Sequence, residues 1–148
     1  MSSKIKIALI AISSLIIIGI LAWKFVNKPT EDVSSLVPKA TYDCQQLIDS
    51  MTADTSMART MIDELVVIEG RVKSINKDSN STTVELGDTS SMSSIICQID
   101  TRHQDDFKDI NQDQTVSIKG KITSCNIDTD LGLGSTIQMN FCSINKHK

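Results

Sequence analysis

The segments VIEGRV (residues 67–72) and VSIKGKI (residues 116–122) nearly repeat one another, and each sets a glycine inside a run of strand-forming residues. A glycine in the middle of a strand marks a bulge or a sharp bend. A strand that bends at Gly70 or Gly120 is able to pair with neighbours on both sides, as the strands of a small closed barrel must. The two segments therefore predict a barrel and give Gly70 and Gly120 a structural role, but they indicate no reaction.

Further strand and helix patterns surround these two segments. Alternation of apolar and polar residues, with turn residues between the runs, predicts strands at residues 65–75, 82–86, 94–100, 115–123 and 136–144. Apolar residues three and four apart predict short helical segments at residues 42–50, 56–65 and 103–110. Three strands, a helical insert and two more strands are the order of the OB-fold, a five-stranded Greek-key barrel. The predicted class is all-β with minor α, the barrel being preceded by a short helical region.

The N-terminal segment contains an uncharged run of 17 residues, Ile7–Trp23, with lysines on both sides. A membrane-spanning helix needs about 20 mostly apolar residues, with a lower limit near 17. The run predicts an uncleaved transmembrane helix, with a cleaved signal peptide and a buried core helix as the alternatives. A slight excess of positive charge before the run favours a cytoplasmic N-terminus and a single-pass membrane protein whose C-terminal domain lies outside the cytoplasm.

These patterns divide the chain into three expected parts. Residues 1–28 form the membrane anchor, residues 29–41, bracketed by two prolines, form a linker, and residues 42–148 form the OB-fold domain with its N-terminal helix. After residue 28 the chain holds 11 basic and 18 acidic residues, a balance of −7. Such a domain repels polyphosphate unless a local basic stripe overcomes the charge, and the sequence indicates no such stripe.

Several short segments also carry a family resemblance. They are Ala58, Ile68–Ile75, Ile96-Cys97, Val116–Gly120 and Met139–Cys142. In their order and spacing the chain resembles the tRNA_anti-like OB-fold family, small bacterial proteins that often carry an N-terminal anchor or a lipoprotein signal. The resemblance covers roughly the last 100 residues. It implies the fold and no settled activity.

The four cysteines, Cys44, Cys97, Cys125 and Cys142, are an even number, and an exported domain permits disulfides. The third and fifth strands of an OB-fold are neighbours, so Cys97 and Cys142 are expected close together, while Cys125 and Cys142 bracket the last hairpin. A disulfide among these three residues is one interpretation, and buried thiols that act as small hydrophobes are the other. The resembling family often has a cysteine just after the fourth-strand glycine, and its displacement here to Cys125 leaves a family-like pairing open.

Patterns for catalysis or metal binding are weak. Asp128 and Asp130 faintly follow a calcium loop, but the third acidic ligand and the distant glutamate are missing. His103 and His147 are the two histidines, and neither stands in a pattern with a nucleophile and a carboxylate. No C-x-x-C pair occurs. We therefore expect no enzyme activity, no catalytic residue, no metal and no cofactor.

The function predicted from these observations is that of a non-catalytic, membrane-anchored binding or assembly module. Its expected partners are the membrane, through the N-terminal helix, and an envelope protein, a peptide or a saccharide. Nucleic acid is predicted to be an unlikely partner, because residues 82–86 and 94–100 offer no aromatic platform and the domain is acidic. The alternatives are an oligonucleotide-binding OB-fold protein and a redox or hydrolytic accessory enzyme of the envelope.

Overall fold

The computed structural model describes residues 3–27, 31–128 and 132–145, with side chains in the first helix from residue 12 onward. The chain divides into two compact units, Met1–Glu31 and Asp32–Lys148. The first unit is the helix α1, Ser3–Val26. Within the described part of the chain, no helix combines the length and the hydropathy that crossing a membrane requires. The predicted transmembrane helix is therefore not supported by the structure, and the location outside the cytoplasm stays a prediction.

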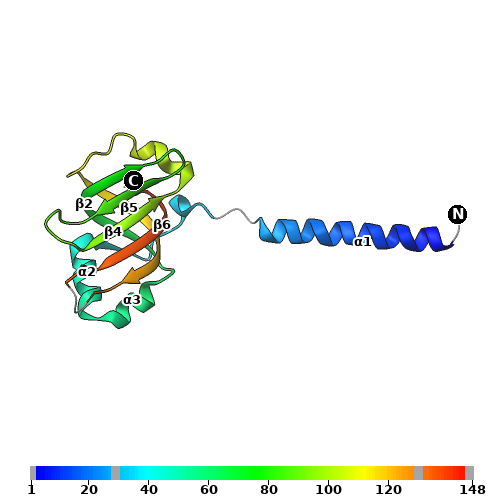
Figure 1. Ribbon diagram of the computed structural model, residues 1–148, viewed down its shortest axis with the longest axis horizontal. Coiled ribbons are helices and arrows are strands. Elements are labelled where there is room, and N and C mark those ends of the chain that lie inside the picture. The colour runs from blue at the N-terminus through cyan, green and yellow to red at the C-terminus, as the bar shows by residue number, and fades with distance from the viewer. Residues whose placement is uncertain (1–2, 28–30, 129–131, 146–148) are drawn as a thin grey trace. The chain divides into compact units, whose positions relative to one another are not determined.

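The second unit is built on a closed five-stranded barrel (Figure 1). Its strands are β2 (Leu65–Lys77), β3 (Thr82–Leu86), β4 (Ser94–Ile99), β5 (Thr115–Asn126) and β6 (Thr136–Ile144). β2 pairs antiparallel with β3, and β3 with β4; β4 lies parallel to β6, and β6 pairs antiparallel with β5. The first half of β2 returns to β5 and closes the barrel. The predicted barrel and its strand order are confirmed.

The segment ahead of the barrel forms two elements that the sequence patterns do not reveal. The 3₁₀ turn η1 (Val33–Ser35) buries Val33, and the strand β1 (Ala40–Asp43) lies parallel to the first half of β2. The backbone N–H of Lys39 also donates to the carbonyl of Leu65 at 2.8 Å. The polar composition of residues 29–41 predicts a linker, but hydrogen bonds to the edge of β2 order residues 40–43, which is a tertiary effect.

Three helical segments lie at the two ends of the barrel. α2 (Cys44–Ala53) and α3 (Thr55–Met61) lie at one end, and the 3₁₀ segment η2 (Thr101–Phe107) lies at the other (Figure 1). Aspartates cap all three: Asp43, Asp54 and Asp100 each accept a backbone N–H in the first turn, as side-chain oxygens at helix starts commonly do. Phe107 closes the η2 end of an otherwise aliphatic core and is fully buried.

Gly70 and Gly120 lie in strands and approach neighbouring atoms closely. Gly70 lies in β2 where its pairing passes from β5 to β3, and Gly120 lies beside a register shift between β5 and β6. A Cβ added at Gly70 would stand 2.7 Å from Cys44 Cβ, and one at Gly120 would stand 2.6 Å from Cys142 Sγ. Neither position has room for a side chain, because contacts that short do not occur between packed carbon and sulfur atoms.

Candidate functional site

The outer face of the barrel over β3 and β4 carries one acidic side chain among neutral ones. Thr83, Glu85 and Ile96 are partly exposed there, and Gln98 is exposed, while Val84 between them points into the core. Asp100, at the end of β4, is only 8% exposed. Its carboxylate accepts a hydrogen bond from Arg102 Nε at 2.9 Å and also pairs with Arg102 Nη2, which lowers the pKa of Asp100 below its usual value. Its negative charge is thereby largely neutralised.

The acidic residue at the centre of this face is also paired. Glu85 accepts a hydrogen bond from Ser74 Oγ at 2.8 Å, and Lys73 Nζ lies 3.4 Å from its other oxygen. Burial alone would raise the pKa of Glu85, but the hydrogen bonds from Ser74 and Ser94 and the charge of Lys73 lower it overall. Glu85 is therefore ionised at neutral pH and balanced by an adjacent cation.

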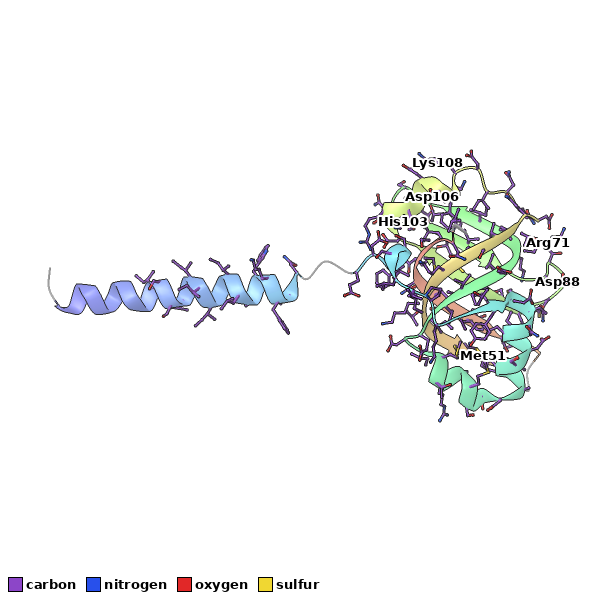
Figure 2. All side chains as sticks on the ribbon, turned by 180° about the vertical axis from the view of Figure 1, so that it is seen from behind. Met51, Arg71, Asp88, His103, Asp106 and Lys108 are labelled. Carbon is purple, nitrogen blue, oxygen red and sulfur yellow. The ribbon has the colours of Figure 1, made fainter. Side chains whose placement is uncertain are left out.

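Two exposed cations flank Lys73 on the same strand. Arg71 places its Nε 3.2 Å from an Asp113 carboxylate oxygen, with its side chain 59% exposed, and Lys77 Nζ donates to the backbone carbonyl of Lys108 at 3.0 Å. Figure 2 shows Arg71 and Lys108 on the outside of the barrel domain. We call Arg71, Lys73 and Lys77 the basic edge. From its first to its last residue it runs about 20 Å along β2. The bulge between Val72 and Ser74 shifts the register of β2, so Lys77 pairs with the buried Thr82 and lies exposed at the far end of the strand, at the border of the outer face.

An aromatic side chain borders the same face from the other side. β4 and β6 pair in register from Ser94↔Thr136 to Cys97↔Met139 and again at Ile99↔Cys142, so one extra residue of β6 bulges opposite Gln98. Phe141 lies in that bulge with a backbone φ of 57° and 37% of its surface exposed. The prediction that this face lacks an aromatic residue considered only the strands at residues 82–86 and 94–100, and the parallel β4–β6 pairing adds Phe141 next to them.

A cavity of about 260 Å³ lies on the outer side of β5 and β6, between them and the segment that precedes β1. It is lined by Ser34, His103, Asp106, Lys119, Ser143, Ile144 and Asn145. Lys119 is a buried lysine whose Nζ donates to the carbonyls of Ser34 at 2.6 Å and Leu36 at 3.0 Å. We call residues 32–36 the strap, because Lys119 holds this segment against the barrel.

The strap has a second attachment at its first residue. His103 Nε2 and Asp32 Oδ1 lie 2.9 Å apart, and Asp106 approaches the other ring nitrogen of His103 at 3.9 Å (Figure 2). The hydrogen bond to His103, followed by those from Ser34, holds the pKa of Asp32 well below its usual range. Because the folded-state pKa of Asp32 is depressed, its ionisation stabilises the fold above pH about 4, and this contribution disappears as the pH falls below that value.

Replacing Asp32 by asparagine is therefore expected to lower stability most at pH about 6 and to lower it less at pH about 2.5, where the carboxyl of the unfolded chain is already protonated. Thermal melting of both proteins at the two pH values measures this. Asp49→Asn, at an exposed position of α2, is the control. An equal loss of stability at both pH values would show that the negative charge of Asp32 has no part in holding the strap.

The cysteines are free thiols, and three of them are buried. Cys97 and Cys142 lie in the core; burial raises the pKa of the Cys142 thiol, and a hydrogen bond with Cys97 raises it further. Burial likewise raises the pKa of Cys44, to about 12, and that of Cys125, whose Sγ lies 3.9 Å from the sulfur of Met51. Thiols held in the protonated form are poor nucleophiles. The expected proximity of Cys97 and Cys142 is seen here.

The remaining acidic candidates do not gather into a metal site among the residues that the structure describes. Asp128 accepts a hydrogen bond from the backbone N–H of Leu133, whereas Asp130 and His147 lie outside the described residues. Asp105 pairs with Lys108 at 2.7 Å, and Asp113 pairs with Arg71. Asp128 thus stabilises the conformation of its loop, and Asp105 and Asp113 form ion pairs at the surface.

The closed barrel, with a helical insert between its third and fourth strands, defines the class of the protein as an OB-fold. A family model described as tRNA_anti-like matches residues 1–131. The chain belongs to the tRNA_anti-like family.

Solved structures share the barrel at low sequence identity. A candidate nucleic acid-binding lipoprotein from Klebsiella pneumoniae subsp. pneumoniae is 15% identical, with a TM-score of 0.56, and the match covers 80% of this chain and 100% of that one. The aspartyl tRNA synthetase from Entamoeba histolytica is 12% identical, with a TM-score of 0.43 over 62% of this chain and 20% of that one. A replication protein A heterotrimer bound to single-stranded DNA is 10% identical, with a TM-score of 0.34 over 54% of this chain and 56% of that one. No curated protein matches the chain.

The partner prediction from the sequence is wrong. It favoured the membrane and an envelope protein, a peptide or a saccharide, and it set nucleic acid aside. The structural neighbour with a TM-score of 0.56 is instead named as a nucleic acid-binding lipoprotein. The physical reason for the error is that aromatic residues were sought on residues 82–86 and 94–100 alone and that charge was summed over the domain, whereas β2 and β6 border the same face.

Proposed function

We propose that the protein is a non-catalytic module that binds single-stranded nucleic acid across the outer face of β2, β3 and β4. The observation that carries the proposal is the basic edge along β2, which borders the outer face of an OB barrel of the tRNA_anti-like family. OB-folds bind single strands by tracking the backbone with positive charge and stacking bases on the sheet. Arg71 and Lys77 extend into solvent at either end of the edge, where phosphates can reach them.

The charge of the domain sets the expected strength of binding. Carboxylates exceed basic residues overall, so binding depends on the local field of the basic edge and weakens quickly as salt screens it. Glu85 pairs with Lys73, and Asp100 pairs with Arg102. These ion pairs offset the two negative charges that would most directly repel a nucleic acid on this face. The protein is therefore expected to be a weak, salt-sensitive binder rather than a tight one.

Catalysis has no part in the proposal. The described histidine, His103, is engaged with the strap. Burial raises the pKa of the Cys44, Cys125 and Cys142 thiols and makes them poor nucleophiles. The match to the tRNA synthetase covers a fifth of that enzyme's chain and brings none of its activity here.

Titration of a fluorescently labelled, mixed-sequence single strand of about 12 nucleotides with the full-length protein tests the proposal, since sites in OB-folds take about 4 to 16 nucleotides. At about 20 mM salt, anisotropy is expected to rise with a dissociation constant in the micromolar range, and at about 200 mM salt the affinity is expected to fall at least tenfold. A flat titration at low salt with both DNA and RNA would refute the function.

A further inference from the structure

The outer side of β6 carries a row of three side chains: Phe141, Ser143 and Asn145. Cys142 and Ile144, which alternate with them, pack against the core. Alternate residues of a strand project from the same side and stand about 7 Å apart. The row therefore leads from the edge of the β3–β4 face to the cavity of about 260 Å³, which Ser143 and Asn145 line.

Phe141 is held in a conformation that its local sequence does not favour. Its φ of 57° lies in the left-handed region, which bulky residues rarely adopt, and conformations of this kind concentrate at functional sites. Of the three aromatic residues after residue 31, Phe107 is fully buried and Tyr42 is partly buried against the core, whereas Phe141 is 37% exposed. The bulge thus presents a ring to solvent that a regular strand would not place there.

Ser143, in contrast to Phe141, is buried, and its hydroxyl has no hydrogen-bond partner among the described residues. The residue is 1% exposed, and its Oγ makes no hydrogen bond with the described part of the chain. Burying a hydroxyl without a hydrogen bond is unfavourable, so native proteins retain such a group where water or a ligand forms the missing hydrogen bond. Since Ser143 lines the cavity, that missing partner belongs in the cavity.

The other polar groups of the cavity indicate the chemistry of its occupant. Lys119, the cross-strand partner of Ser143, directs two of its three N–H bonds to the strap and has a third to offer. Asn145 supplies an amide, and Asp106 supplies a carboxylate. A phosphate would be repelled by the negative charge of Asp106. The edge of a nucleobase carries both donors and acceptors, and it therefore suits a cavity lined by both kinds of group.

We propose that this row is a nucleobase subsite, in which Phe141 stacks on the face of one base and the edge of that base enters the cavity to bond Ser143 Oγ and Lys119 Nζ. The inference rests on the proposed function, because it places one nucleotide of the bound strand. It assigns Ser143 a role in binding that is separable from its effect on stability.

Three variants test the subsite. Phe141→Leu keeps the backbone strain and most of the apolar bulk but removes the ring, so affinity for the single strand is expected to fall at least about fivefold, as stacking contributes about 1–3 kcal/mol per base. Phe141→Tyr keeps the ring and is expected to retain wild-type affinity. Ser143→Ala removes an unpaired buried hydroxyl, so its melting temperature is expected to stay level or rise while its affinity falls.

The outcomes separate the two proposals. If the wild-type protein fails to bind any single strand, the proposed function and the subsite both fall. If the wild type binds and both Phe141→Leu and Ser143→Ala bind equally well, only the subsite is refuted, and water is the occupant of the cavity. A second readout does not depend on variants: a strand carrying 5-iodouracil is expected to photocrosslink to the peptide that contains Phe141. A crosslink confined to other peptides would overturn the subsite.

Discussion

Replacing Gly120 by valine is expected to destabilise the barrel by about 3 kcal/mol and to lower its melting temperature by roughly 10 °C. A Cβ at this position would stand 2.6 Å from Cys142 Sγ and 3.1 Å from Met139 Cε. Both neighbours are fully buried, so neither can move without disturbing the core. Valine restricts the unfolded chain more than glycine does and favours a strand, but those gains of about 1 kcal/mol do not offset the overlap.

The control is Lys121→Val, one residue further along β5. Lys121 is partly exposed and pairs with Asp63 at the surface, so valine there is expected to cost less than about 1 kcal/mol. Adding Cys142→Ala to Gly120→Val removes the closest contact and is expected to restore part of the lost stability. Equal melting temperatures for Gly120→Val and Lys121→Val would refute the close packing of Gly120 against β6.

The second large effect concerns the basic edge. Changing Arg71 and Lys77 together to glutamine is expected to weaken binding of a single strand at least about tenfold at low salt and to flatten the dependence of log K on log salt by about 1.4, which is roughly 0.7 for each lost phosphate contact. Lys73 is left in place because its ion pair with Glu85 supports the fold of this face.

A matched pair controls for the change in net charge. Lys39→Gln with Arg59→Gln also removes one lysine and one arginine, but Lys39 pairs with Glu64 next to β1 and Arg59 lies on α3. This control is expected to bind nearly as well as the wild type. If both double variants lose affinity to the same extent, the protein attracts nucleic acid by net charge alone, and the basic edge has no special role.

The barrel was accessible to sequence reasoning because its determinants are local. The predicted strands at residues 82–86 and 136–144 have the observed bounds of β3 and β6, and alternation fixes their faces up to the bulge at Phe141. The glycines at 70 and 120 stand out because they interrupt strong strand patterns. The predicted helix at residues 103–110 is a 3₁₀ segment, Thr101–Phe107, and the buried Phe107 is its last residue.

The candidate site was far less predictable because it depends on pairings between distant segments. Phe141 borders the proposed binding face because β6 bulges where it pairs with β4 and β5, both of which are distant in the sequence. Lys119 reads as an ordinary exposed strand residue, and it is buried because the strap, 85 residues earlier in the chain, folds over it. The strap and β1 have a largely polar sequence. Hydrogen bonds with β2 and β5, and not local propensity, hold these two segments in a defined conformation.

The measurement that most directly tests the binding face is the mapping of amide chemical shifts in the ¹⁵N-labelled, full-length protein during addition of a short single strand at low salt. The account predicts that the largest changes fall on β2 from Arg71 to Lys77, on β3 and β4, and around Phe141 of β6. Changes confined to α2, α3 and β1, or none at all in the second unit, would contradict it.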